Sequence, residues 1–149
     1  MNKRFWVEVR VSYDGVAENG KETNMKETWL VRAVTFAEAE SRAYEVVSGN
    51  HSISDVDVEA CTKRNISAVW VSSTNDGLRK FYKVRCEGLL INEETGKERR
   101  CKRDYLIGSP NLLEAYETFV KCMSYTKFSE YEVLGINLTP IVEILSGHE

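Results

Sequence analysis

The chain has 149 residues, of which 42% are hydrophobic and 29% are charged. This balance is typical of a globular protein rather than a disordered one, and no apolar run reaches the roughly 18–20 residues that a membrane-spanning helix needs. The formal net charge of -3 provides no overall attraction to a polyanion, so nucleic-acid binding would require a local basic patch.

The amino terminus starts with the basic residues Lys3 and Arg4 and then alternates without an apolar stretch, so we expect no signal peptide. The cysteines form no C-x-x-C pair, and we expect buried free thiols rather than a zinc or disulfide site. These features predict a cytoplasmic protein, inside the host cell if a phage encodes it, with no membrane partner. The cysteines are Cys61, Cys86, Cys101 and Cys122.

The first predicted elements form a hairpin. Residues 5–13 alternate apolar and polar side chains, as a half-buried strand does, and residues 27–34 predict a second strand. Between them, Asn19-Gly20 is a turn signal, because tight hairpins require positive φ angles that these residue types adopt. Within the second strand we expect Leu30 to be buried.

A helix is predicted after the hairpin. Thr35 is a good N-cap residue and Glu38 stands three positions later, which predicts a capping box. The helix is expected to end near Val47, before a stop signal at Gly49. Closing strands follow at 55–63 and 66–72. The apolar stripe of the helix is predicted from Phe36, Ala39, Ala43, Tyr44 and Val47.

The second half repeats this order. Strands are predicted at 80–91 and 98–107 around a turn at 92–96, with Leu106 buried like Leu30. Asn111 and Glu114 predict a second capping box. Closing strands are expected at 131–138 and 141–145. The apolar stripe of this helix is predicted from Leu112, Leu113, Ala115, Tyr116, Phe119, Val120 and Met123.

Comparison of the chain with itself indicates a duplication. A shift of 76 residues places 18–47 on 94–123 with eight identities, where unrelated segments would share about two. A shift of 75 aligns both flanks, 6–11 with 81–86 and 54–58 with 129–133. One-residue slips are tolerated in loops.

We therefore predict an α+β fold made by tandem duplication of a β-β-α-β(-β) unit, with antiparallel sheets that each carry one helix and are related by a pseudo-twofold axis. Repeat one spans 1–75 and repeat two spans 76–149, and we expect them to pack as one compact body. The sheet faces that the helices leave uncovered either pack on each other or form a partner surface.

Residue types that perform catalysis are scarce. Only His51 and His148 could act as a histidine base, and both are expected in solvent. Asp55, Asp57 and Glu59 alternate along one strand and could hold a hard cation, although a solvated strand face is the favoured interpretation. No glycine-rich phosphate loop is present. We expect a protein that is not an enzyme and has no cofactor and no metal site.

The second hairpin concentrates positive charge. Between Arg79 and Arg103, nine basic residues accompany four acidic ones. Basic side chains beside aromatic platforms are typical of single-strand binders, whereas the competing interpretation is a solvated face whose aromatic rings point to the core. Alternation already places Lys83 and Arg85 opposite Tyr82. The candidate nucleic-acid-binding residues are Lys83, Arg85, Lys97, Arg99, Arg100, Lys102, Arg103, Tyr82 and Tyr105, with a weaker set of Arg10, Lys21, Lys26 and Arg32 on the first hairpin.

Structural motifs of both halves match a family pattern: the opening residues 5–11, the Gly20-Lys21 turn, the stretch 29–40 and the second opening at 81–84. In these motifs the chain resembles an uncharacterised domain family of gut bacteria, their phages and mobile elements, built from two tandem strand-strand-helix-strand repeats. The resemblance spans nearly the whole chain. It implies a fold but no established activity, and it contributes no catalytic residues.

Two functions stay open at this point. The leading hypothesis is a non-enzymatic protein that binds single-stranded or structured nucleic acid through its basic, aromatic hairpins. The alternative is a phage or mobile-element protein-interaction module, an inhibitor or adaptor of a host protein, which could form a homodimer. Exposed strand edges would then accept a partner strand.

Overall fold

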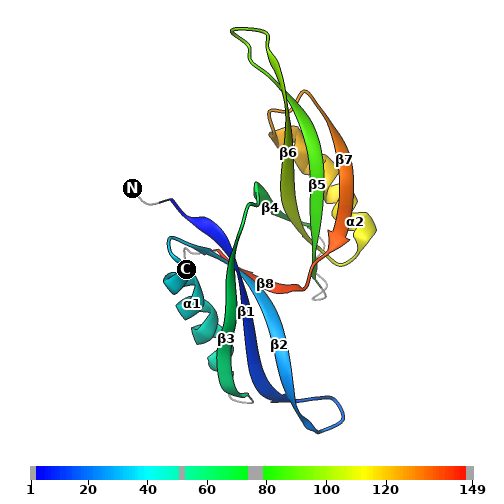
Figure 1. Cartoon of the computed structure of the whole chain (residues 1–149). Coiled ribbons are helices and arrows are strands. Elements are labelled where there is room, and N and C mark those ends of the chain that lie inside the picture. The colour runs from blue at the N-terminus through cyan, green and yellow to red at the C-terminus, as the bar shows by residue number, and fades with distance from the viewer. Residues whose placement is uncertain (1–2, 51–52, 74–78, 147–149) are drawn as a thin grey trace. The chain divides into compact units, whose positions relative to one another are not determined.

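The computed structural model describes residues 3–50, 53–73 and 79–146. Each half begins with a hairpin that leads into a helix (Figure 1). The elements of the first half are β1 (Phe5–Val16), β2 (Glu22–Ala33), α1 (Phe36–Ser48), β3 (Ser54–Arg64) and the short β4 (Ala68–Val71). Those of the second half are β5 (Lys80–Ile91), β6 (Glu98–Ser109), α2 (Leu112–Cys122), the 3-10 turn η1 (Met123–Tyr125), β7 (Glu130–Leu138) and β8 (Ile141–Leu145).

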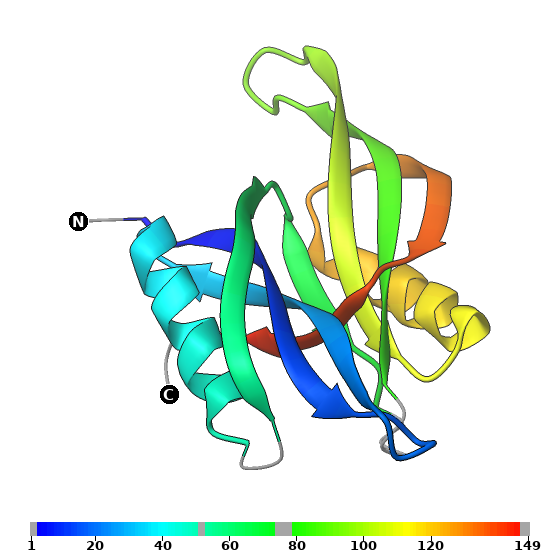
Figure 2. The ribbon, with the colours of Figure 1, turned by 60° about the horizontal axis from the view of Figure 1, so that its bottom comes forward.

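The strands form two four-stranded sheets of the same design. The strand order is β3-β1-β2-β8 in one sheet and β4-β6-β5-β7 in the other, which read backwards is β7-β5-β6-β4. The two orders therefore correspond strand for strand. Figure 2 shows α1 lying along one face of the first sheet and α2 lying along one face of the second. The predicted α+β fold with a duplicated unit is confirmed.

The last strand of each repeat joins the sheet of the other half. β4 pairs parallel with β6, and β8 pairs parallel with β2. A parallel neighbour within the same sheet needs a crossover of a dozen or more residues, whereas only residues 65–67 separate β3 from β4. This link is too short to bring β4 back beside β2. The compact units are therefore Met1–Asn65 with Pro140–Glu149, and Ile66–Thr139, rather than the sequence repeats that meet at residue 75.

Backbone details recur in both halves. β1 shifts register on β3 directly after Arg10, and β5 shifts on β7 directly after Arg85, which is 75 positions later. The hairpin residues Gly20 and Gly96 have φ angles of 82° and 74°, a conformation that glycine adopts without the steric cost of a Cβ atom. Duplication explains why a bulge and a turn recur at equivalent positions.

Each helix buries a narrow stripe against its sheet. The stripe is formed by Ala39, Ala43 and Val47 on α1, and by Ala115 and Phe119 on α2. The predicted stripes were too wide, because a flat sheet covers only one side of a helix. The predicted core residues that are instead exposed are Phe36, Tyr44, Leu112, Leu113, Tyr116 and Val120.

Leu30 and Leu106 are buried as predicted, with 0% and 1% of their surface exposed. Their chain neighbours Val31 and Ile107 belong to the hydrophobic clusters under α1 and α2. Because successive strand residues point to opposite faces, both leucines lie on the faces that the helices do not cover.

Both helices begin at their predicted caps. The Thr35 hydroxyl accepts a hydrogen bond from the backbone N–H of Glu38 at 3.0 Å, and the Asn111 side-chain oxygen accepts one from the N–H of Glu114 at 2.9 Å. Each cap satisfies one of the amide groups that a helix leaves without an internal partner.

The glutamates that follow the caps have different partners. The Glu38 carboxylate accepts a hydrogen bond from the backbone N–H of Val34 at 2.6 Å, which closes the first box. The equivalent residue of the second half is Pro110, which has no N–H to donate. Glu114 accepts instead from the Ser72 hydroxyl at 3.1 Å, so this side chain connects α2 to the end of β4.

His51 and His148 lie outside the described residues. Within the described residues, neither helix combines the length and the apolar character that crossing a bilayer would take.

Candidate nucleic-acid interface

The hairpin of β5 and β6 holds most of the predicted binding residues. Its strands pair from Lys80 opposite Ser109 to Ile91 opposite Glu98. Residues directly opposite each other share a face, so the register sorts the side chains into two sets. The face on which α2 packs is called the helix-side face, and the other is called the open face.

Tyr82 and Tyr105 lie on the helix-side face and are buried, with 6% and 2% exposure. Tyr105 stacks on Trp70 with ring centroids 4.8 Å apart and meets the Phe119 ring edge-on at 5.7 Å. Both tyrosines are therefore core residues, and neither ring is accessible to a nucleic-acid base. Alternation along the strand, which had already separated Tyr82 from Lys83, accounts for this placement.

The open face carries charge of both signs. Arg85 Nε lies 4.0 Å from Asp104 Oδ1, and Arg100 Nη1 lies 3.8 Å from Glu87 Oε1. Exposed pairs of this kind contribute little stability, but they offset positive charge. This face therefore has no excess positive charge. Its basic residues are Lys83, Arg85, Arg100 and Lys102, and its acidic residues are Glu87, Glu98, Asp104, Glu130 and Glu132.

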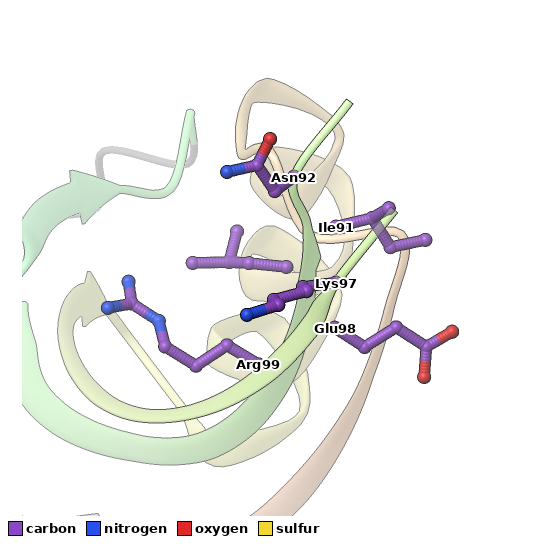
Figure 3. A pocket seen from close by; sticks show the side chains of 6 residues that line it. Ile91, Asn92, Lys97, Glu98 and Arg99 are labelled. Carbon is purple, nitrogen blue, oxygen red and sulfur yellow. The ribbon is translucent and has the colours of Figure 1, made fainter. Parts of the chain in front are cut away.

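Positive charge without an opposing acidic residue lies on the helix-side face, toward the tip. Arg99 lies opposite Leu90, and Arg103 lies opposite Cys86. Figure 3 shows Lys97 and Arg99 directed to one side of the hairpin and Glu98 to the other. Alternation thus separates basic from acidic residues that are adjacent in sequence. These side chains border an open hollow of ≈ 580 Å³, lined by Leu90, Ile91, Asn92, Lys97, Glu98 and Arg99.

Lys97, Arg99 and Arg103 form the basic row of the helix-side face. An aromatic ring contacts Arg103, the member of the row farthest from the hairpin tip. The Arg103 guanidinium carbon lies 4.8 Å from the centroid of the Phe128 ring, within the range of a cation–π contact. Burial raises the pKa of Tyr105 above its ordinary value, and a hydrogen bond with Arg103 opposes part of that shift. Arg103 is half-buried, whereas Lys97 and Arg99 are exposed.

Phe128 and Tyr125 are site residues that the sequence reasoning missed. The segment after α2, orange in Figure 1, is attached to β5 through the Ser129 N–H, which donates to the Leu89 carbonyl at 3.0 Å. Tyr125 in this segment is 80% exposed. One signal was present: Gly88 occupies the repeat position of Tyr13, which indicates that a ring from elsewhere fills the space.

The basic residues of the first hairpin are dispersed. Lys26 Nζ lies 3.5 Å from Glu59 Oε2, and the Arg32 guanidinium carbon lies 5.0 Å from the centroid of the Trp6 ring. Arg10 is exposed on the face away from α1, and Lys21 lies in the turn. The structure does not gather these four residues into one row.

Arg99 and Arg103, the basic β6 residues on the helix-side face, have no basic residue at their repeat positions. Thr23 occupies the position of Arg99, and Glu27 occupies the position of Arg103, each 76 residues earlier. The basic row is therefore a property of the second half alone.

Residues 5–147 match a protein family described as "Domain of unknown function (DUF4494)". The chain belongs to this family. The match spans both repeats, so the duplicated unit lies within a single family domain. A search of the curated proteins found no match to the chain.

Among the described residues, the other side chains with catalytic or metal-binding groups do not cluster. Burial raises the pKa of the Cys61, Cys86 and Cys122 thiols. A raised pKa keeps a thiol protonated near neutral pH, which is its less nucleophilic form. All four cysteines are free. Within the part of the chain that the structure describes, no three His, Cys, Asp or Glu side chains are grouped to hold a metal ion, and this includes Asp55, Asp57 and Glu59.

Proposed function

We propose that the protein is a non-enzymatic binding protein that holds single-stranded or structured nucleic acid on the helix-side face of the β5–β6 hairpin. The observation that carries the proposal is the separation of charge across this hairpin. Arg99 and Arg103 on this face, with Lys97 directed to the same side, have no acidic residue paired opposite them, while the open face is balanced.

The arrangement of the row favours an extended polyanion over a small anion. Arg99 and Arg103 are four residues apart on one strand, which separates them by about 13 Å along its axis. Lys97 extends the row toward the tip. A phosphate chain can contact several such cations in succession, and each phosphate that is neutralised releases counterions. Affinity should then fall steeply as salt rises, with little preference for sequence.

The source of base stacking differs from the sequence expectation. Tyr82 and Tyr105 are unsuitable because they are buried. Tyr125 is exposed, and it stands three residues before Phe128, the ring that contacts Arg103. Aromatic side chains beside a basic groove contribute stacking that every base can use. We therefore assign Tyr125 the stacking role in this proposal.

The test compares two double charge reversals, one on each side of the β5–β6 hairpin. Fluorescence anisotropy would measure binding of short labelled single-stranded DNA, single-stranded RNA and duplex DNA at several salt concentrations. We expect Lys97→Glu with Arg99→Glu to weaken binding by about tenfold or more, because two phosphate contacts become repulsive. Arg103 is left unchanged, since its contact with Phe128 also supports the fold.

The matched control is Arg100→Glu with Lys102→Glu, which makes the same change of net charge on the open face. We expect it to reduce affinity much less, with circular dichroism verifying that both variants stay folded. Equal losses in the two double variants would mean that only overall charge matters. No binding by the unchanged protein at low salt would overturn the nucleic-acid proposal.

One observation favours the alternative function, a protein-interaction module. Four apolar residues of α2 are exposed, and α1 has Glu40 at the repeat position of one of them, Tyr116. Exposed apolar patches often mark interaction sites. In this alternative the chain acts as an inhibitor or adaptor of a host protein, or as a homodimer, in a phage or mobile-element setting. The residues are Leu112, Leu113, Tyr116 and Val120.

A further inference from the structure

A pocket in the first half surrounds the carboxylate of Glu27. Glu27 lies on β2 opposite Val11, on the face that packs against α1. One carboxylate oxygen accepts a hydrogen bond from the Tyr13 hydroxyl at 2.7 Å, and the other accepts one from the Trp29 indole N–H at 3.1 Å. These three side chains line an open pocket of ≈ 270 Å³ together with Val46 and Ile53.

The negative charge of Glu27 has no positive partner among the described residues. Both of its hydrogen-bond donors are neutral, and no described lysine or arginine forms an ion pair with it. A half-buried carboxylate is more stable beside a cation, because burial removes part of its hydration. Burial also raises the pKa of Tyr13 to about 12, and the hydrogen bond to Glu27 and the charge of Glu27 add to this shift.

The end of α1 adds to the negative potential of the pocket. Val46 and Val47, which line it, belong to the last turn of this helix, and that turn carries no basic residue. The carbonyl end of a helix has partial negative charge that favours a nearby cation. The ring face of Trp29, a half-buried residue that lines the pocket, attracts cations as well. Three separate features therefore favour the same kind of ligand.

The second half supplies a cation at the equivalent place. Arg103 stands 76 residues after Glu27 and contacts the Phe128 ring, and it lowers the pKa of Tyr105, which stands 76 residues after Trp29. The last turn of α2 also carries Lys121. The fold thus accepts a guanidinium between aromatic rings at this position, and in the first half a carboxylate occupies it.

We propose that the Glu27 pocket binds an organic cation, a guanidinium or alkylammonium group on an aliphatic stem. The cation would come from an arginine or lysine side chain of a partner peptide, or from a free small amine. Its charged group meets the Glu27 carboxylate, and its stem lies against Val46 and Ile53. This site is separate from the proposed nucleic-acid surface, and its ligand has the opposite charge.

The test follows the indole N–H resonance of Trp29 by NMR in the full chain, with Trp29→Phe used to assign it. The probes are n-butylguanidinium and n-butylammonium, and n-butanol serves as the neutral control. We expect a saturable shift with both cations and none with the alcohol. Glu27→Gln, which keeps the size of the side chain but removes its charge, should weaken binding by about tenfold or more.

A second variant keeps the proposal testable if Glu27→Gln does not fold. Tyr13→Phe retains the Glu27 carboxylate, so it should bind both cations at least as tightly as the unchanged chain. A shift of equal size with n-butanol, unchanged affinity in Glu27→Gln, or lost binding in a folded Tyr13→Phe would each overturn the proposal. Tighter binding of a capped arginine peptide than of n-butylguanidinium would identify a protein side chain as the source, and the reverse order would identify a free amine.

Discussion

The contact between Gly88 and Phe128 leaves no room for a side chain at position 88. A Cβ atom there would come within 2.4 Å of the Phe128 ring. We expect Gly88→Ala to lower the free energy of unfolding by about 1–3 kcal/mol, because the ring must move. Urea denaturation would measure the change.

The same contact predicts non-additivity. Phe128→Ala removes the ring and should itself be destabilising. Once the ring is absent, Gly88→Ala no longer causes a steric clash. The double variant should therefore be more stable than the sum of the two single changes predicts. Additive effects within about 0.5 kcal/mol would show that the ring does not occupy the space over Gly88.

Sequence reasoning succeeded for residues whose role depends on near neighbours. Thr35 and Asn111 were predictable caps because the N-cap signal lies within four residues, and the burial of Leu30 was predictable from its place in the second strand, where it aligns with Leu106. The placement of Phe128 was not predictable in this way. Its contact with Gly88 joins residues 40 positions apart, and only the comparison with Tyr13 in the other repeat indicates it.

At the scale of elements, the two helix caps offer a paired test. Thr35→Ala and Asn111→Ala should each lower the free energy of unfolding by about 1 kcal/mol, because each leaves a helix amide without its side-chain acceptor. Serine at either position keeps an acceptor and should retain most of the stability. Thermal or urea unfolding would measure the four variants, and serine variants as unstable as the alanine variants would contradict the capping role.

The helices, the strands and their order were predictable from the sequence. The strands with which β4 and β8 pair were not predictable. Apolar alternation identifies β4 and β8 as strands without indicating which sheet they join. The informative feature was the length of the connections, since 65–67 and 139–140 are too short for a parallel crossover within one sheet. The same limit applies to the site, because alternation separated Tyr82 from Lys83 and Arg85 correctly, whereas Phe128, the ring that contacts Arg103, lies outside these strands.

At the scale of the whole molecule, the repeats share a backbone plan and differ in surface chemistry. The bulges, turns and caps recur, which shows that the fold tolerates either sequence at these elements. The charge at the position of Glu27 and Arg103 is inverted. Since the fold accepts both, structural need does not explain the difference. Both binding proposals account for it as specialisation of the halves for ligands of opposite charge.

The last strand of each repeat pairs with the sheet of the other half. A substitution in such a strand should therefore loosen the compact unit that the strand joins, and not the sequence repeat to which it belongs. Trp70 belongs to the first repeat, yet its ring stacks on Tyr105 of the second half. Leu145 belongs to the second repeat, yet it packs against the cluster under α1. We expect Trp70→Ala to reduce amide hydrogen-exchange protection mainly in β5, β6 and β7, because these strands lose a packing partner.

Leu145→Ala is the reciprocal variant and should reduce protection mainly in β1, β2 and β3. Truncations of this kind at partly buried sites cost about 1–3 kcal/mol, which is enough to increase local opening without unfolding the chain. If each strand instead supported its own repeat, Trp70→Ala would loosen β1–β3 and Leu145→Ala would loosen β5–β7. That crossed pattern would contradict the parallel pairings of β4 with β6 and of β8 with β2, on which the division into two units depends.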